Sequence, residues 1–188
     1  REAVSAMLNR ALSDNPEFVN SYTSWAPGAF DAQLDARYGD WFWMWWTRQN
    51  GQLTPVIDNT DFATDSAYDY YACPLATLQS CVVEPYFYTD AYQQQYWLAT
   101  ISAPIMVNGQ MIGIVAFDYQ VDMLQSIVDA SPPFDGAGKL AVISNQGNLL
   151  GVTGQPDLFG QSLEAIHPQT FKDDTQAIQS GDVSITRN

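Results

Sequence analysis

The sequence predicts an α+β fold with antiparallel sheets. Asn108-Gly109 separates two long apolar strand patterns, and Asn50-Gly51 separates two shorter ones. Asn-Gly favours the type I′ turn of a two-residue hairpin, so each pair predicts two adjacent antiparallel strands. Helical patterns do not alternate with the strands one by one, as a parallel sheet built from βαβ units would require.

The elements are predicted in chain order from hydrophobic periodicity. In the first part they are a helix over 3–12 that ends at 13–16 (SDNP), a strand over 18–25, a hairpin around residue 50, a loop over 58–83, a long hairpin over 92–121 and a short helix over 121–128. The Pro- and Gly-rich stretch 131–138 (SPPFDGAG) predicts a module boundary. Beyond it come strand, turn and strand over 139–154, a helix over 168–179 and the start of a strand over 183–187. Both ends of the chain interrupt a pattern, so we expect the polypeptide to continue beyond them.

Composition narrows the classes of partner. The chain has 188 residues, 46% of them hydrophobic, which suffices for a buried core. Its net charge of −14 repels nucleic acid and attracts cations, so nucleic acid is excluded as a partner. No apolar run approaches the roughly 20 residues of a membrane helix, and no signal peptide is present. Segments that target or anchor the chain are therefore expected outside these residues.

The two cysteines, Cys73 and Cys81, are eight positions apart. They are either bridged or two free thiols, and we predict the disulfide, which implies an oxidising compartment outside the cytoplasm. Neither lies in a CxxC pair or beside a histidine, so no metal site and no cofactor is predicted. The one histidine, His167, is expected on the surface.

Residues 41–46 (WFWMWW) carry more aromatic surface than one strand needs. In a strand, alternation places Trp41, Trp43 and Trp45 on one face and the other three residues of the run on the opposite face. One interpretation is burial in the core or between modules. The other is an aromatic box for an ammonium group, which aromatic faces attract.

Several longer segments carry a family resemblance, best from residue 18 to 124. They are YTSWAPGAFDAQ, DYYACP, VVEPYFY and ATISAPIMVNGQMIGIVAFDYQVDML. Their order resembles the double Cache ligand-binding domain of bacterial chemoreceptors, the methyl-accepting chemotaxis proteins. The resemblance implies two PAS-like modules on a long N-terminal helix: the end of that helix at 1–17, a membrane-distal ligand-binding module at 18–133 and a partial membrane-proximal module at 134–188. It further implies a periplasmic domain of an inner-membrane protein, homodimeric in the full-length receptor, and not an enzyme.

The resemblance also implies a ligand site. In amino-acid-sensing members an arginine holds the ligand carboxylate, and the acid that ends the second hairpin strand holds the ammonium. Here Asp118 keeps that acid, whereas Tyr68 stands at the arginine position and Tyr88 at a second acidic position. Without the arginine a carboxylate loses its anchor, so we predict a small cationic amine: a polyamine, a biogenic amine or a quaternary ammonium compound. The predicted ligand-binding residues are Asp118, Tyr86, Tyr70, Tyr71, Tyr68, Trp43, Trp45, Trp25, Glu84, Asp31, Asp69 and Tyr88.

Other interpretations remain open. The domain could sense amino acids, bind or hydrolyse carbohydrate with Glu84 and Asp118 as the acid and base pair, or serve in adhesion. Asp118 could cap the following helix. The remaining acids also have structural alternatives: bonds from Glu84 to backbone amides near Pro85, a turn at Asp31, and a solvated loop for Asp61, Asp65 and Asp69.

Overall fold

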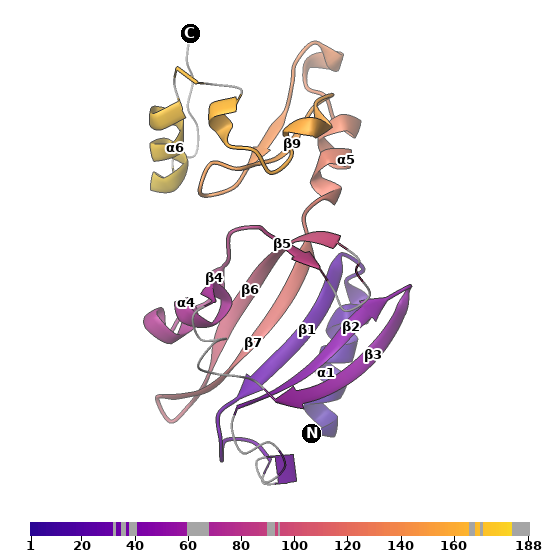
Figure 1. Ribbon diagram of the computed structural model, residues 1–188, viewed down its shortest axis with the longest axis vertical. Helices are drawn as coiled ribbons and strands as arrows, with labels where there is room; N and C mark the ends of the chain where they lie inside the picture. Colours follow the sequence, from indigo (N-terminus) through magenta and orange to yellow (C-terminus); the bar gives the residue numbers. More distant parts are fainter. Residues whose placement is uncertain are drawn as a thin grey trace. The chain divides into compact units, whose positions relative to one another are not determined.

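The computed structural model describes residues 1–31, 33–34, 37, 41–59, 68–89, 93, 95–165, 168–169 and 171–181 (Figure 1). Contacts divide the chain into two compact units. The first comprises Arg1–Val83 and Leu98–Gln120, and the second comprises Glu84–Trp97 and Val121–Asn188. This division differs from a single boundary at 134, because helix α5 (Met123–Ala130) and the segment 84–97 belong to the second unit. The functional division into modules stays a prediction.

Antiparallel pairing dominates the first unit. Within the described residues one sheet has seven strands, six of them in the order β3-β2-β1-β7-β6-β4; the seventh, β5, has its residues in the second unit and pairs with β6. The strands are β1 (Phe18–Trp25), β2 (Phe42–Gln49), β3 (Gln52–Asn59), β4 (Cys81–Val82), β5 (Tyr86–Thr89), β6 (Gln95–Val107) and β7 (Gln110–Gln120). The pairs β1–β2, β2–β3, β1–β7, β4–β6 and β6–β7 are all antiparallel. The predicted α+β class is confirmed.

Both predicted hairpins are confirmed. Asn50 and Gly51 have φ of 49° and 77°, and Asn108 and Gly109 have 50° and 79°, the positive values that a type I′ turn requires. A bulge between Ile105 and Met106 shifts the pairing of β6 with β7 by one residue, so that Thr100 lies opposite Asp118.

Helices cover both faces of this sheet (Figure 1). On one face α1 (Glu2–Asp14) packs against β1 and β2, where Leu8 joins Phe42 and Met44 in a buried cluster. On the other face Tyr71, from helix α4 (Asp69–Thr77), packs with Trp41, Trp43 and Trp45. The predicted alternation of the aromatic run is therefore confirmed.

The prediction of a loop over 58–83 is wrong for its described part. Residues 69–77 form α4, and Cys81–Val82 form β4. Sequence periodicity missed this helix because it is short and contains Pro74, which lacks the N–H of a helical hydrogen bond. Tertiary burial stabilises it instead, since Tyr71 and Pro74 are both buried.

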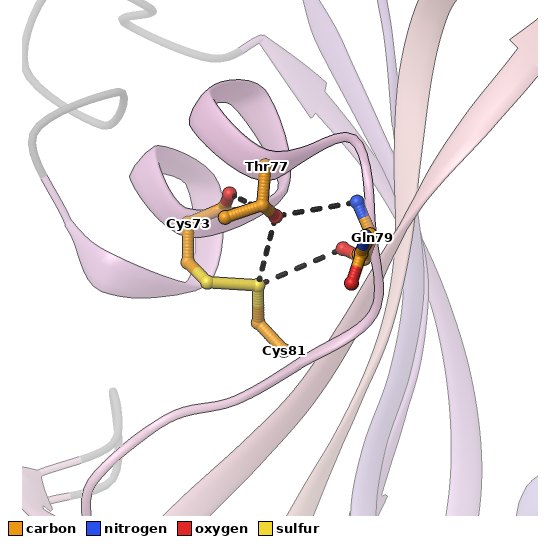
Figure 2. Close-up of a disulfide and its surroundings, with 4 residues drawn as sticks. All are labelled: Cys73, Thr77, Gln79 and Cys81. Atoms are coloured by element: carbon orange, nitrogen blue, oxygen red, sulfur yellow. Dashed lines mark hydrogen bonds between the residues drawn. A yellow bond between two sulfur atoms is a disulfide. The ribbon is translucent and has the colours of Figure 1, made fainter.

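The predicted disulfide between Cys73 and Cys81 is confirmed, and it ties α4 to β4 with Cα atoms 6.2 Å apart (Figure 2). Thr77 braces the same turn: its Oγ1 donates to the Cys73 carbonyl at 2.8 Å and accepts from the Gln79 N–H at 3.2 Å. Helix α4 is thus fixed to the sheet by a covalent bond and by packing.

The second unit contains the remaining elements. They are α5 (Met123–Ala130), η1 (Phe134–Gly136), β8 (Ala141–Ile143), β9 (Leu149–Val152), η2 (Pro156–Leu158), η3 (Leu163–Ala165) and α6 (Phe171–Ser180). Of these, the three short 3-10 helices η1, η2 and η3 were not predicted. Gly181, with φ of 75°, ends α6 as predicted. The predicted strand over 183–187, His167, Asp61 and Asp65 lie outside the described residues. In the described ranges, every helix is too short or too polar to cross a lipid bilayer.

Candidate ligand-binding site

Asp118 is the centre of the candidate site. It lies near the end of β7, where the register places it between Asn20 of β1 and Thr100 of β6. Asn20 Nδ2 donates to its Oδ2 at 2.7 Å, Thr100 Oγ1 donates to its Oδ1 at 2.7 Å, and the Tyr22 hydroxyl approaches Oδ1 at 3.4 Å. None of these bonds goes to helix α5, whose N-cap is Asp122. The helix-cap interpretation of Asp118 is therefore wrong.

The carboxyl group of Asp118 is buried, with 6% of the residue exposed. Burial raises its pKa above the ordinary value of 3.8, and the hydrogen bonds from Asn20, Thr100 and Tyr22 lower the pKa by less. All three donors are neutral, and within the described part of the chain no lysine or arginine pairs with Asp118. Among the described residues the site therefore holds a buried acid without a countercharge.

Aromatic rings adjoin this acid. Tyr22, Trp43 and Tyr70, here called the aromatic triad, have ring centroids 5.0 Å (Tyr22–Trp43), 6.2 Å (Trp43–Tyr70) and 6.4 Å (Tyr22–Tyr70) apart. Because the Tyr22 hydroxyl also reaches Asp118, the triad and the carboxylate form one continuous group. Aromatic faces beside a desolvated carboxylate are a favourable environment for an ammonium group.

Helix α4 positions two further tyrosines. Tyr71 is fully buried, contacts the Trp43 ring at 5.7 Å and hydrogen-bonds the Ser24 hydroxyl. Tyr68 precedes the helix, is 53% exposed and stacks on Tyr70 with centroids 5.6 Å apart. Tyr68, which is predicted to replace the arginine of amino-acid sensors, thus lies at the outer edge of the aromatic group.

The structure does not bring every predicted residue to this group. Trp25 lies on the opposite face of the sheet, stacked on Phe30 at 4.2 Å in the cluster with α1, because odd positions of β1 point away from Tyr22. Asp31 accepts from the backbone N–H groups of Gln33 and Leu34 and pairs with Arg1 at 2.9 Å, as expected for a turn residue.

The remaining predicted residues have other positions. Trp45 lies opposite Tyr22 in the register and packs against the same cluster, whereas Asp69 is exposed in the first turn of α4. Glu84, Tyr86 and Tyr88 belong to the second unit. There Glu84 Oε1 accepts bonds from the Ser144 hydroxyl and from Asn148 Nδ2, not from backbone amides near Pro85. A role for these three in ligand binding stays a prediction.

Three residues of the candidate site were missed: Asn20, Tyr22 and Thr100. Alternation on the predicted strand over 18–25 puts Asn20 and Tyr22 on one face, but no local signal shows that this strand pairs with β7. Thr100 was missed because the bulge in β6 shifts its pairing with β7 by one residue. Within the described ranges no group of three or more metal-ligating side chains occurs.

The raised pKa of Asp118 predicts how stability depends on pH. The native state retains a proton that the unfolded chain releases near pH 3.8, so this contribution is complete below pH 3.8 and is lost as pH rises through the folded pKa. Denaturant unfolding of the unliganded wild type and Asp118→Asn from about pH 3.5 to about pH 7 should show the wild type losing stability relative to the variant. Parallel curves would contradict the assignment.

An antiparallel α+β fold with an N-terminal helix is the architecture of extracellular sensor domains of the PDC or Cache type. A family model described as the first PDC sensor domain of methyl-accepting chemotaxis protein-like proteins matches residues 4–126. The chain belongs to this family. Its members are chemoreceptor sensor domains and not enzymes.

Three known proteins illustrate the similarity. The methyl-accepting chemotaxis protein TlpQ of Pseudomonas aeruginosa is 25% identical over 201 aligned positions, which cover 96% of this chain but only 28% of TlpQ. The protein mmHK1S-Z3 is assigned as a histidine kinase. Its extracellular domain has a TM-score of 0.77 at 26% identity, over 96% of this chain and 66% of that one. The Campylobacter jejuni chemoreceptor Tlp3, in complex with L-valine, has a TM-score of 0.57 at 18% identity, over 84% and 54%. The chain thus spans under two thirds of the length of these relatives.

Proposed function

We propose that this chain is the sensing domain of a transmembrane chemoreceptor and that it binds a small cationic amine at Asp118. The observation that carries the proposal is the buried carboxylate, which has neutral donors only and adjoins the aromatic triad. An unpaired buried charge is costly, whereas an ammonium ion would compensate it. The carboxylate retains capacity for such a bond, because Oδ2 accepts a single bond and a carboxylate has about four acceptor sites.

The distribution of cations favours an amine over an α-amino acid. By the family resemblance Tyr68 stands at the position of the carboxylate-binding arginine, and within the described residues the arginine ion pairs Arg1–Asp31 and Arg10–Asp14 both lie outside this group. A ligand carboxylate would be buried among aromatic rings with no guanidinium to receive it. The L-valine complex of Tlp3 makes an amino acid the main alternative for the fold, so the test must separate the two classes.

The proposal also covers the modules of the receptor, its oligomeric state and its location in the cell. We propose that residues 18–133 are the membrane-distal module of a double Cache domain, that residues 134–188 begin the membrane-proximal module, and that the whole receptor is a homodimer with this domain in the periplasm. The family model concerns a first sensor domain and ends at residue 126, which supports a second module beyond it. The disulfide and the extracellular domain of mmHK1S-Z3 support a location outside the cytoplasm.

A matched ligand panel tests the proposed function. Each amino acid is compared with the amine left when its α-carboxylate is removed, together with diamines, quaternary ammonium compounds and oligosaccharides. A bound amine at about 100 times its Kd should stabilise the domain by about 2.7 kcal/mol, which raises Tm by roughly 5–10 °C for a chain of this size. The corresponding amino acids and the oligosaccharides should produce no comparable shift. A shift with an amino acid and none with its amine would contradict the proposal.

A further inference from the structure

Ser102 carries an unsatisfied hydroxyl group in the same face of the sheet as Asp118. It lies on β6 two residues from Thr100, so the two side chains share a face. Its strand neighbours are Cys81 on β4 and Ala116 on β7. The residue is fully buried, and within the described ranges its Oγ has no hydrogen-bond partner.

Neighbouring buried hydroxyls show that this sheet normally satisfies such groups. Ser21 donates to the Leu8 carbonyl at 2.8 Å, Ser24 bonds the Tyr71 hydroxyl, and Thr100 donates to Asp118. Within the described part of the chain the other buried hydroxyl without a partner is Thr175, in the second unit. A buried hydroxyl without a hydrogen-bond partner is energetically unfavourable unless water or a ligand bonds to it.

The register places Ser102 diagonally across from Asp118. Thr100 lies opposite Asp118 and Ser102 lies opposite Ala116, so the diagonal Cα separation is about 7–8 Å in an antiparallel pair. Ala116 lies beside both residues in this face, and its side chain is a single methyl group. On its other side Ala116 faces Tyr22, a member of the aromatic triad. A ligand held at Asp118 that extends along β7 would therefore reach the Ser102 hydroxyl.

We propose that Ser102 Oγ is a second polar contact for the ligand of this site. The inference rests on the proposed function and narrows its ligand class to amines with a second hydrogen-bonding group. Since a hydroxyl both donates and accepts, that group is an amine or a hydroxyl. Its distance from the ammonium is on the order of a three- or four-carbon chain, as the diagonal separation requires. A quaternary ammonium compound with no other polar group would leave Ser102 unsatisfied.

Ser102→Ala and a pair of matched ligands test this contact. The ligands are a straight-chain diamine and the monoamine in which a methyl group replaces the second nitrogen, and titration calorimetry measures both. Ser102→Ala should lower the affinity for the diamine by about 10-fold, because a hydrogen bond to a charged group is lost. The affinity for the monoamine should not change. The Tm of the unliganded variant should stay equal or rise, because an unsatisfied hydroxyl is removed. The control is Ser21→Ala, which removes a buried hydroxyl from the other face and should leave the ratio of the two affinities unchanged.

The possible outcomes distinguish a failure of the Ser102 contact from a failure of the proposed amine binding at Asp118. If both amines bind in an Asp118-dependent way and Ser102→Ala leaves their ratio unchanged, the contact is refuted and the proposed function stands. If Ser102→Ala lowers both affinities equally and lowers Tm, Ser102 is structural and the contact is also refuted. If neither amine binds the wild-type domain, the proposed function fails for these ligands, and the Ser102 contact fails with it.

Discussion

Asp118→Asn is expected to abolish measurable binding of a cationic amine while the domain stays folded. Asparagine keeps the shape of the side chain and still accepts a hydrogen bond, but it removes the charge that opposes the ammonium. Truncating one partner of a buried, hydrogen-bonded charge pair costs on the order of 2–5 kcal/mol, a loss of about 30-fold to several thousand-fold in affinity. Titration calorimetry with the best-binding amine from the panel measures the effect.

Asp31→Asn is the control for this experiment. Asp31 is also an acid with hydrogen-bond partners, but it pairs with Arg1 in a turn and lies outside the group around Asp118. The control should bind the amine like the wild type. Equal affinities of wild type and Asp118→Asn would contradict the proposal, and the acid that holds the ligand would then have to be sought at Glu84 or Asp69.

Removing the disulfide is expected to destabilise the domain by about 2–3 kcal/mol, because the bridge restricts a loop of nine residues in the unfolded chain. The corresponding loss in Tm is about 5–10 °C for a chain of this length. Affinity for the amine should fall as well, since α4 carries Tyr70 and Tyr71 and its covalent link to β4 would be gone. Urea unfolding and titration of the Cys73→Ala, Cys81→Ala double variant measure both effects.

Thr77→Val serves as the matched control for the disulfide. It removes the hydroxyl that bonds the Cys73 carbonyl and the Gln79 N–H but keeps the bridge (Figure 2). Thr77→Val should lower the free energy of unfolding by about 1 kcal/mol, which is less than the loss expected for the double variant. Intact-mass measurement without reductant should find no alkylatable thiol in the wild type. Two alkylatable thiols, or equal stability of the wild type and the double variant, would contradict the prediction.

Local chemistry explains what could be predicted of the fold. The turns at Asn50-Gly51 and Asn108-Gly109 depend on the residues in the turn itself, and alternation along β2 assigned Trp43 and Phe42 to opposite faces. The bridge between Cys73 and Cys81 spans only eight positions. Helix α4 could not be predicted in this way, because burial of Tyr71 and Pro74 stabilises it against a weak local pattern.

The candidate site could be predicted only in part. Asp118 was predicted from its place at the end of an apolar strand face and from the family resemblance, and Tyr70 and Tyr71 from the resemblance. Trp25 was wrongly placed among the predicted ligand-binding residues, because the pattern of its strand does not indicate which face packs against α1. Counting back from the turn at Asn108-Gly109 without a bulge would have placed Thr100 opposite Phe117, not Asp118.

The sequence by itself determined the antiparallel hairpins, the division of aromatic residues between two faces, the disulfide and the acid at residue 118. Each depends on neighbouring residues or on a short repeat along the chain. The tertiary structure alone decided that β1 pairs with β7, which brings Asn20 and Tyr22 to Asp118 across about 100 positions of sequence. It also decided that a bulge brings Thr100 to the same carboxylate and that the Ser102 hydroxyl has no hydrogen-bond partner among the described residues. These outcomes depend on burial and on strand pairing over long sequence separations, which no local pattern encodes.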